Sequence, residues 1–288
     1  MDTTRAVQPK LPLDGVRVIE FTHMVMGPTC GMILADLGAE VIKVEPPGGD
    51  KTRKLPGLGI GFFRTFNRNK KSVIIDINTA EGRAMAVELI GKADVVIENF
   101  RPGLMKKLGL DYQTLSRRFP RLIYASHKGF LPGPYENRVA LDEVVQMMGG
   151  LSYMTGPPGR PLRAGTSVND IMGGMFGAIG IMSALIERQH TDRGQEIQSA
   201  LFENCVFLVA QHMQQYSMTG VPPPPMPARV SPWSVYDVFT LADGAQLFIA
   251  AVNDKQWQVL CGILERPDLA ADPALATNEQ RVHARPAL

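Results

Sequence analysis

The sequence predicts an α/β protein built on a doubly wound parallel sheet. Short apolar runs, which suit buried strands, alternate along most of the chain with stretches of helical pattern. The first strand–helix–strand unit is complete: residues 16–21 and 41–44 are expected to be strands, and Pro28 suits the first turn of the helix between them. Such units place their strands parallel, with helices on both faces of the sheet.

The later elements continue this alternation. Further strands are expected at residues 73–77, 94–100 and 121–126. Helices are expected at residues 80–92 and 112–118, with a third that ends at Gly149-Gly150. Residues 195–216 are expected to start as a strand and to continue as a helix. A chain of this pattern supplies enough strands and helices for one large open sheet.

A cluster of prolines at residues 222–225 and 227 predicts a domain junction. It separates a large α/β domain, residues 1–220, from a second, smaller α+β domain that starts at residue 228. In the smaller domain two strand-like stretches flank Asp243-Gly244, a β-hairpin signal, and Asn253 or Asp254 is expected to cap the helix that follows. No compact closing element is expected in the last residues, NEQRVHARPAL.

Composition excludes several classes of protein. Apolar residues make up 45% of the 288, enough for a sizeable core, and a net charge of +2 argues against a nucleic-acid surface or a polybasic membrane tail. The three cysteines show neither disulfide nor metal spacing, so no metal site is expected. The N-terminus lacks an apolar signal core, and no run of 18 apolar residues occurs. These features predict a soluble, cytoplasmic protein without a membrane partner.

A nicotinamide cofactor is disfavoured. Glu45 ends the second strand where a ribose-binding acid would lie, but Gly27 and Gly31 do not form the G-x-G-x-x-G pattern after the first strand. The densest basic cluster, FRTFNRNKKS, instead combines cations with phenylalanines, which suits a nucleotide with phosphates, although a solvated surface loop is the alternative.

Four of the expected strand ends carry polar, charged or glycine-rich sequence. These stretches are THMVMGP, EPPGGD, ENFRPG and SHKGFLPG. In open α/β sheets ligands bind beyond the carboxyl ends of the strands. The ligand site is therefore expected at this edge of the sheet.

A polar loop from Arg163 onward delivers Asp170 to the start of a long helix. That helix contains four interior glycines, each of which costs roughly 0.5–1 kcal/mol relative to alanine, so backbone or ligand must come close to it. A carboxylate at a helix N-terminus is expected to stay ionised. From these residues alone, capping by Asn169 or Asp170 and catalysis by Asp170 remain equally open.

Seven ordered blocks resemble the class III CoA-transferases, the family of formyl-CoA transferase and carnitine CoA-transferase (CaiB/BaiF-like). The blocks are LDGVRVIEFTHMVMGP, ADLGAEVIKVEPPGGDKTR, NRNKKS, VIENFRPGLMKKLG, PRLIYASHKGF, VQMMGGLSYMTG and TDRGQEIQSALFE. The resemblance implies a Rossmann-like large domain, a second, smaller domain and an interlocked homodimer. Family members continue beyond the point where this sequence ends, so the smaller domain is expected to be incomplete.

The resemblance also implies a reaction in which acyl-CoA is a substrate and no cofactor is tightly bound. Asp170 would attack the thioester carbonyl to form a mixed anhydride, the released CoA thiolate would form an aspartyl-CoA thioester, and an incoming small carboxylic acid would take over the CoA. Backbone N–H groups at the helix start are expected to stabilise the oxyanion. The implied CoA-binding residues are His23, Met24, Val25, Met26, Asn67, Arg68, Asn69, Lys70, Asn99, Phe100, Arg101, Lys107 and Lys128.

The substrate-facing residues are expected near the same helix. Gly173 and Gly174 would admit the thioester, whereas Gly177 and Gly180 would allow close packing. Arg160 and Arg163 are expected to bind the second carboxylate of a dicarboxylic acid such as succinate, mesaconate or itaconate.

Two alternatives remain. The family contains α-methylacyl-CoA racemases, whose base is a histidine directly before the aspartate that matches Asp142, but this chain has Leu141 there, and His127 belongs to a different block. A transferase is therefore favoured over a racemase. The other alternative is a truncated, non-catalytic protein that binds CoA or acts as a dimer partner.

Overall fold

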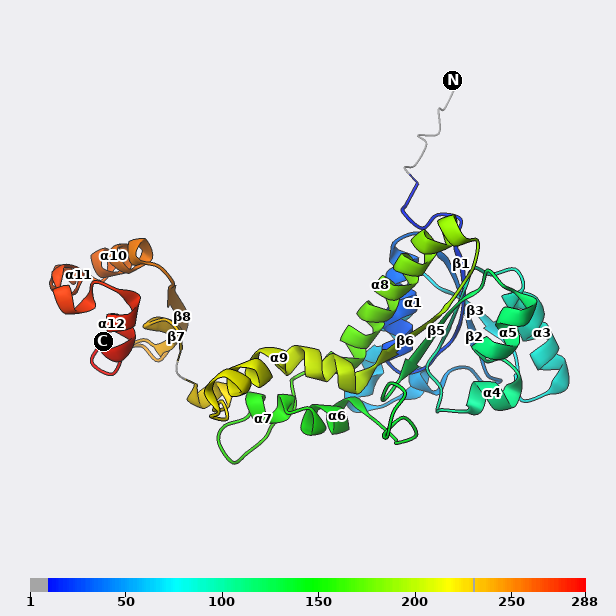
Figure 1. The fold of residues 1–288 in the computed structure, drawn as a ribbon, viewed down its shortest axis with the longest axis horizontal. Coiled ribbons are helices and arrows are strands. Elements are labelled where there is room, and N and C mark those ends of the chain that lie inside the picture. Colours follow the sequence, from blue (N-terminus) through cyan, green and yellow to red (C-terminus); the bar gives the residue numbers. More distant parts are fainter. Residues whose placement is uncertain (1–9, 230) are drawn as a thin grey trace, which may run out of the picture. The chain divides into compact units, whose positions relative to one another are not determined.

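The structure, a computed structural model, describes residues 10–229 and 231–288 (Figure 1). These residues form two compact units, one that ends at Pro227 and one that spans Ala228–Leu288. Residues 1–9, on which the expected absence of a signal segment mainly depends, lie outside the described residues.

In the described part of the first unit, six strands form one sheet in the order β3-β2-β1-β4-β5-β6, and every neighbouring pair is parallel. The strands are β1 (Arg17–Phe21), β2 (Glu40–Glu45), β3 (Lys71–Ile74), β4 (Val95–Glu98), β5 (Ile123–Lys128) and β6 (Glu196–Ala200). The strand order reverses between β1 and β4. The predicted doubly wound sheet is confirmed, and the reversal opens a crevice at the carboxyl ends of these strands.

Helices cover both faces of this sheet (Figure 1). One face carries α1 (Met26–Asp36) and α8 (Val168–Thr191), and the other carries α3 (Ala80–Ile90), α4 (Leu104–Leu108) and α5 (Tyr112–Arg118). Alternate residues of each strand point to opposite faces, so Val95 and Ile97 pack with the first pair of helices while Val96 packs with the second group. The strands β1, β4 and β5 are buried on both faces, which explains why apolar side chains predominate on both sides of them, whereas the edge strand β3 is partly exposed.

The long helix α8 is, within the described ranges, the one helix with the length and composition to cross a bilayer. A core helix of a soluble protein satisfies the same criteria. Here Ala178, Ile181 and Ala184 are buried with the sheet and α1. This packing accounts for the apolar residues on one side of α8.

The first unit also contains the long helix α9 (Leu201–Thr219) and the short elements η1 (Lys51–Lys54), η2 (Gly57–Gly61), α2 (Phe62–Phe66), α6 (Asp142–Met148) and α7 (Leu151–Thr155). The 3₁₀ turn η3 (Met226–Ala228) spans the boundary between the units. Several boundaries differ from expectation by a few residues, and two of these differences have a local cause. β3 ends at Ile74 because its partner β2 ends at Glu45, directly opposite. The helix expected to end at Gly149-Gly150 is followed directly by a second short helix, α7. Gly150 has a φ of 88°, a left-handed conformation that allows the chain to begin α7 immediately after α6.

The second unit contains the expected hairpin. β7 (Val235–Thr240) and β8 (Gln246–Ala251) pair antiparallel, and Asn253 caps α10 (Asp254–Ile263). The remaining elements are α11 (Pro267–Ala271), η4 (Pro273–Leu275) and α12 (Asn278–His283). The expectation of no closing element was wrong: a capping box at Thr277 starts α12, and its Arg281 is buried against Asp254. The contact with Asp254 is long-range, so local polarity did not indicate it.

Candidate active site

The carboxyl ends of β1, β4 and β5 meet around one cavity of about 510 Å³. Asp170, at the start of α8, lies on its wall. The structure brings eight of the predicted site residues to this cavity. They are His23, Met24, Met26, Asn99, Phe100, Arg101, Lys128 and Asp170. Parallel strands deliver their following loops to the same edge, which is why residues so distant in sequence converge here.

Asp142, on α6, holds the N-terminus of α8. Its Oδ2 accepts the backbone N–H groups of Asn169 at 2.8 Å and Asp170 at 3.1 Å, and its Oδ1 accepts from Gln146. In the described chain the carboxylate of Asp170 accepts no hydrogen bond, and Ser167 at the N-cap makes no side-chain cap. The cap therefore comes from Asp142, and the carboxylate of Asp170 is left for the cavity.

This arrangement overturns two expectations. The N–H groups at the helix start are bound by Asp142, so they do not serve an oxyanion. Burial and, to a smaller extent, the negative charge of Asp142 raise the pKa of Asp170, Arg163 opposes both, and the net result is a pKa of about 7. Desolvation and a like charge thus outweigh the helix dipole, and Asp170 is about half protonated at pH 7 rather than fully ionised.

The glycines of α8 make room for protein, not for substrate. A Cβ on Gly173 would collide with Met26, and a Cβ on Gly174 would lie 2.5 Å from Thr29 Cβ and 2.7 Å from the Met26 carbonyl oxygen. The expectation that these two glycines admit the thioester was wrong, because α1 occupies the space. Gly177 and Gly180 allow close packing as predicted: a Cβ there would meet His127 and Ile197.

The two arginines expected at the second carboxylate lie elsewhere. Arg163 forms an ion pair with Glu143 and donates to the Ala164 carbonyl oxygen at 3.1 Å. Arg160 is exposed, and neither guanidinium lines the cavity. Arg138, which sequence reasoning missed, does line it, together with Arg101 and Lys128. No local signal marked Arg138, since its loop carries no recognisable element.

The NRNKKS turn uses most of its polar groups internally. Lys70 is the clearest correction: its side chain is 2% exposed, and its ammonium lies 2.9 Å from Glu20 Oε1 and 2.8 Å from the Pro28 carbonyl oxygen. Arg68 and Asn69 both bind Asp36. The charge of Lys70 is therefore not free to meet a phosphate. Asn67, Val25 and Lys107 also lie outside the lining of the Asp170 cavity.

A second cavity of about 510 Å³ adjoins the first, beyond the ends of β1, β2 and β3. Its walls are mainly apolar and include Val44, Ile75, Leu104 and Leu108. Both cavities are lined by His23, Met24 and Phe100, and the rings of His23 and Phe100 lie 5.7 Å apart. These three residues, here called the shared wall, stand between an apolar chamber and the chamber of Asp170.

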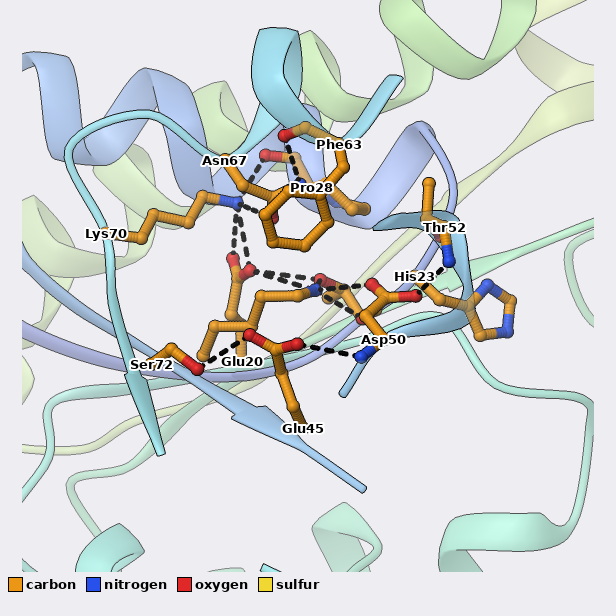
Figure 2. Close-up of polar contacts among 12 residues, drawn as sticks. Glu20, His23, Pro28, Glu45, Asp50, Thr52, Phe63, Asn67, Lys70 and Ser72 are labelled. Carbon is orange, nitrogen blue, oxygen red and sulfur yellow. Dashed lines mark hydrogen bonds and ion pairs between the residues drawn. The ribbon is translucent and has the colours of Figure 1, made fainter. Parts of the chain in front are cut away.

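Glu45 lines the apolar chamber but is already bound by protein (Figure 2). Burial opposes its ionisation, but hydrogen bonds from Arg53, Ser72 and the Asp50 N–H lower its pKa to about 2. A carboxylate so occupied is poorly placed to bind a ribose, in keeping with the argument against a nicotinamide cofactor.

His127, which sequence reasoning gave little weight, also lines the Asp170 cavity. Burial lowers its pKa to about 4, so the imidazole is neutral at pH 7. Neither ring nitrogen has a hydrogen-bond partner among the described residues. Its position at the end of β5 follows from sheet register, which the sequence alone does not show.

Comparisons with known proteins agree on one family. The family model described as CoA-transferase family III matches residues 13–288. The acetyl-CoA:oxalate CoA-transferase of Acetobacter aceti is 40% identical, over 100% of this chain and 76% of the relative. The succinate–glutarate CoA-transferase of Agrobacterium fabrum is also 40% identical, over 95% and 71%. The crystal structure of a CAIB/BAIF family protein from Brucella suis superposes with a TM-score of 0.83 at 40% identity, covering 97% of this chain and 76% of the other.

Proposed function

The chain belongs to CoA-transferase family III, and we propose that it moves CoA from an acyl-CoA thioester to a small dicarboxylic acid with Asp170 as the nucleophile. The observation that supports this role most directly is the unoccupied carboxylate of Asp170 in the cavity where the strand ends meet. A carboxylate can attack a thioester directly once it is ionised, so no separate general base is required.

The two cavities suit the two halves of the donor. The apolar chamber would take the adenosine end of CoA, with α4 as one wall, and the thioester would pass the shared wall to reach Asp170. Lys128 and Arg101 line the Asp170 cavity and would stabilise the oxyanion that forms on the thioester carbonyl. Asp142 would keep Asp170 in place by binding the first turn of α8.

The acceptor is proposed to be a dicarboxylic acid. Relatives carry oxalate, glutarate or mesaconate in their names. In this chain one carboxylate would attack the aspartyl-CoA thioester at Asp170 while Arg138 or Arg101 binds the other. This assignment replaces Arg160 and Arg163 with cations that line the cavity.

Trapping the intermediate tests the mechanism. Incubation with succinyl-CoA and hydroxylamine is expected to leave a hydroxamate on Asp170, detected by mass spectrometry of the peptide. Asp170→Ala should abolish CoA exchange, and Glu88→Gln, an exposed change on α3, should leave it intact. Full exchange by Asp170→Ala would disprove the nucleophile. CoA binding without exchange across a panel of acids would instead favour the non-catalytic alternative.

We also propose a homodimer in a reducing, cytoplasmic compartment. Large apolar side chains remain exposed along α8 and α9, among them Met175, Ile179, Phe207 and Met218. A second copy covering them would remove this apolar surface from water. The three cysteines are free and buried. Light scattering behind a sizing column would give twice the mass of one chain if the dimer forms.

A further inference from the structure

Four buried charged side chains form a network beside the main chain of residues 22–28. Three of them, Glu20, Asp50 and Lys70, are labelled in Figure 2. Glu20 and Lys43 come from β1 and β2, and Asp50 and Lys70 come from the loops beside them. Lys43 Nζ lies 3.2 Å from Asp50 Oδ2 and 3.6 Å from Glu20 Oε1, while Lys70 Nζ binds the same Glu20. Two ammonium groups thus face two carboxylates in a nearly dry environment.

Each branch of this network ends on the main chain of residues 22–28. Lys43 donates to the Thr22 carbonyl oxygen at 2.6 Å, and Lys70 donates to that of Pro28 at 2.8 Å. Asp50 accepts the Thr52 N–H at 2.8 Å, and the Thr52 hydroxyl in turn accepts the Met24 N–H at 3.1 Å. Side chains from three separate segments therefore converge on one short stretch.

The conformation of Met24 requires such support. Its φ is 61°, in the left-handed region that non-glycine residues enter only when their surroundings hold them there. On the preceding residue, Asn99 accepts the His23 N–H at 3.0 Å and donates to the His23 carbonyl oxygen at 2.8 Å. The main chain at His23 and at Met24, two of the three residues of the shared wall, is thus held by hydrogen bonds to the side chains of Asn99 and Thr52.

Stability alone does not account for this arrangement. Burial of an ion pair costs desolvation energy, and apolar residues of similar volume often serve a core equally well or better. What the branches have in common is their end point, the stretch that lines both cavities.

We propose that Thr52, held by Asp50 and Lys43, is a positioning residue that sets Met24 for acyl-CoA binding. The inference rests on the proposed role of the two cavities. Thr52 acts through Met24: without the hydroxyl, the Met24 N–H loses its acceptor and the left-handed conformation loses its support. The wall between the chambers then adopts several conformations, and ordering it on binding weakens affinity.

Thr52→Val tests this role, since it keeps the side-chain shape and removes the acceptor. The dissociation constant of free CoA, measured by calorimetry, and KM for succinyl-CoA should both rise roughly fivefold to tenfold. The kcat should change less than about twofold, because Asp170 is untouched. Thr52→Ser should restore both constants. Thr79→Val is the control: its hydroxyl accepts the Gly82 N–H at 3.0 Å by the same kind of bond, and it lines neither cavity.

A double-mutant cycle separates this role from direct contact of Thr52 with CoA. Glycine enters the left-handed region freely, so Thr52→Val in a Met24→Gly background should have no further effect on the CoA dissociation constant. An undiminished effect in that background, or unchanged affinity in Thr52→Val alone, overturns the proposal. If the unaltered protein binds CoA but exchanges none, the proposed function fails while the binding series still decides the role of Thr52. Absence of CoA binding overturns both.

Discussion

At the scale of single residues, two carboxylates at the start of α8 have different roles. Asp142 accepts the N–H groups of the helix terminus, and Asp170 faces the cavity without a hydrogen bond of its own among the described residues. Burial and the charge of Asp142 raise the pKa of Asp170 to about 7. Asp142 therefore has two effects: it positions the start of α8, and its negative charge opposes the ionisation of Asp170, the proposed nucleophile.

The pH dependence of exchange follows from this pair. Asp170 must be ionised to attack, so kcat/KM is expected to rise with pH, to reach half its maximum near pH 7, and to level off above it. Asp142→Asn removes a like charge and keeps one acceptor oxygen, so the midpoint should move to lower pH. Initial rates across this range, with Glu88→Gln as control, provide the measurement. A midpoint that stays in place in Asp142→Asn would show that Asp142 does not influence the titration.

At the scale of elements, α1 and α8 pack closely beside the Asp170 cavity, which Met26 of α1 and Asp170 of α8 both line. Gly173 and Gly174 let the first turns of the two helices approach each other, and Met26 and Thr29 fill the space their missing side chains leave. The entropic cost of glycine in a helix is offset here by close packing against the buried core.

Gly174→Ala should therefore destabilise the protein. Its Cβ would press on the Met26 carbonyl and on Thr29, which requires the helices to separate, at about 1–3 kcal/mol of unfolding free energy. Gly262→Ala, in the helix α10, is the matched change, because nothing lies within 4 Å of its added Cβ. It should be neutral or slightly stabilising. Urea denaturation compares each variant with the unaltered protein, followed by circular dichroism for Gly174→Ala in the first unit and by tryptophan fluorescence for Gly262→Ala in the second. An unchanged midpoint in Gly174→Ala would contradict the packing role.

The buried charges between β1 and β2 make a second prediction at this scale. Lys43→Met leaves Asp50 buried without its counter-charge, so the unfolding free energy should fall by about 3–5 kcal/mol. Adding Asp50→Asn removes the orphaned charge and should recover part of that loss. A double variant as unstable as the single one would mean that Asp50 is not the group that Lys43 neutralises.

At the scale of the whole molecule, each unit has a hydrophobic core of its own. The sheet clusters belong to the first unit, and Trp257, Cys261 and Leu275 form the core of the second. The smaller unit buries few large apolar side chains, which limits its stability. We propose that the two units unfold separately.

The tryptophans make this testable. Trp233 and Trp257 are the two tryptophans of the sequence, and both lie in the second unit, so their fluorescence reports that unit alone. Far-ultraviolet circular dichroism is dominated by the helices of the first unit. The fluorescence transition in urea is expected at lower concentration than the dichroism transition. Coincident transitions would show that the units unfold as one.

Local pattern was sufficient for most of the architecture. Alternation of apolar runs with helical segments predicted the parallel sheet, and sheet geometry then placed the strand ends at one edge. Asp170 could be identified as a candidate because the sequence predicts a carboxylate at the start of a helix. The resemblance of seven ordered blocks identified the family. These features depend on neighbours in sequence or on topology that is common to all such sheets.

Only the tertiary structure decided which polar groups are free. Lys70 is bound by Glu20, 50 residues away, whereas Arg138 lines the cavity of Asp170. Asp142 rather than Asp170 holds the start of α8, and α1 rather than substrate fills the space beside Gly173 and Gly174. Each of these outcomes depends on a contact between distant segments. The sequence therefore determined where the site would form, and long-range packing determined which of its charges face the cavity.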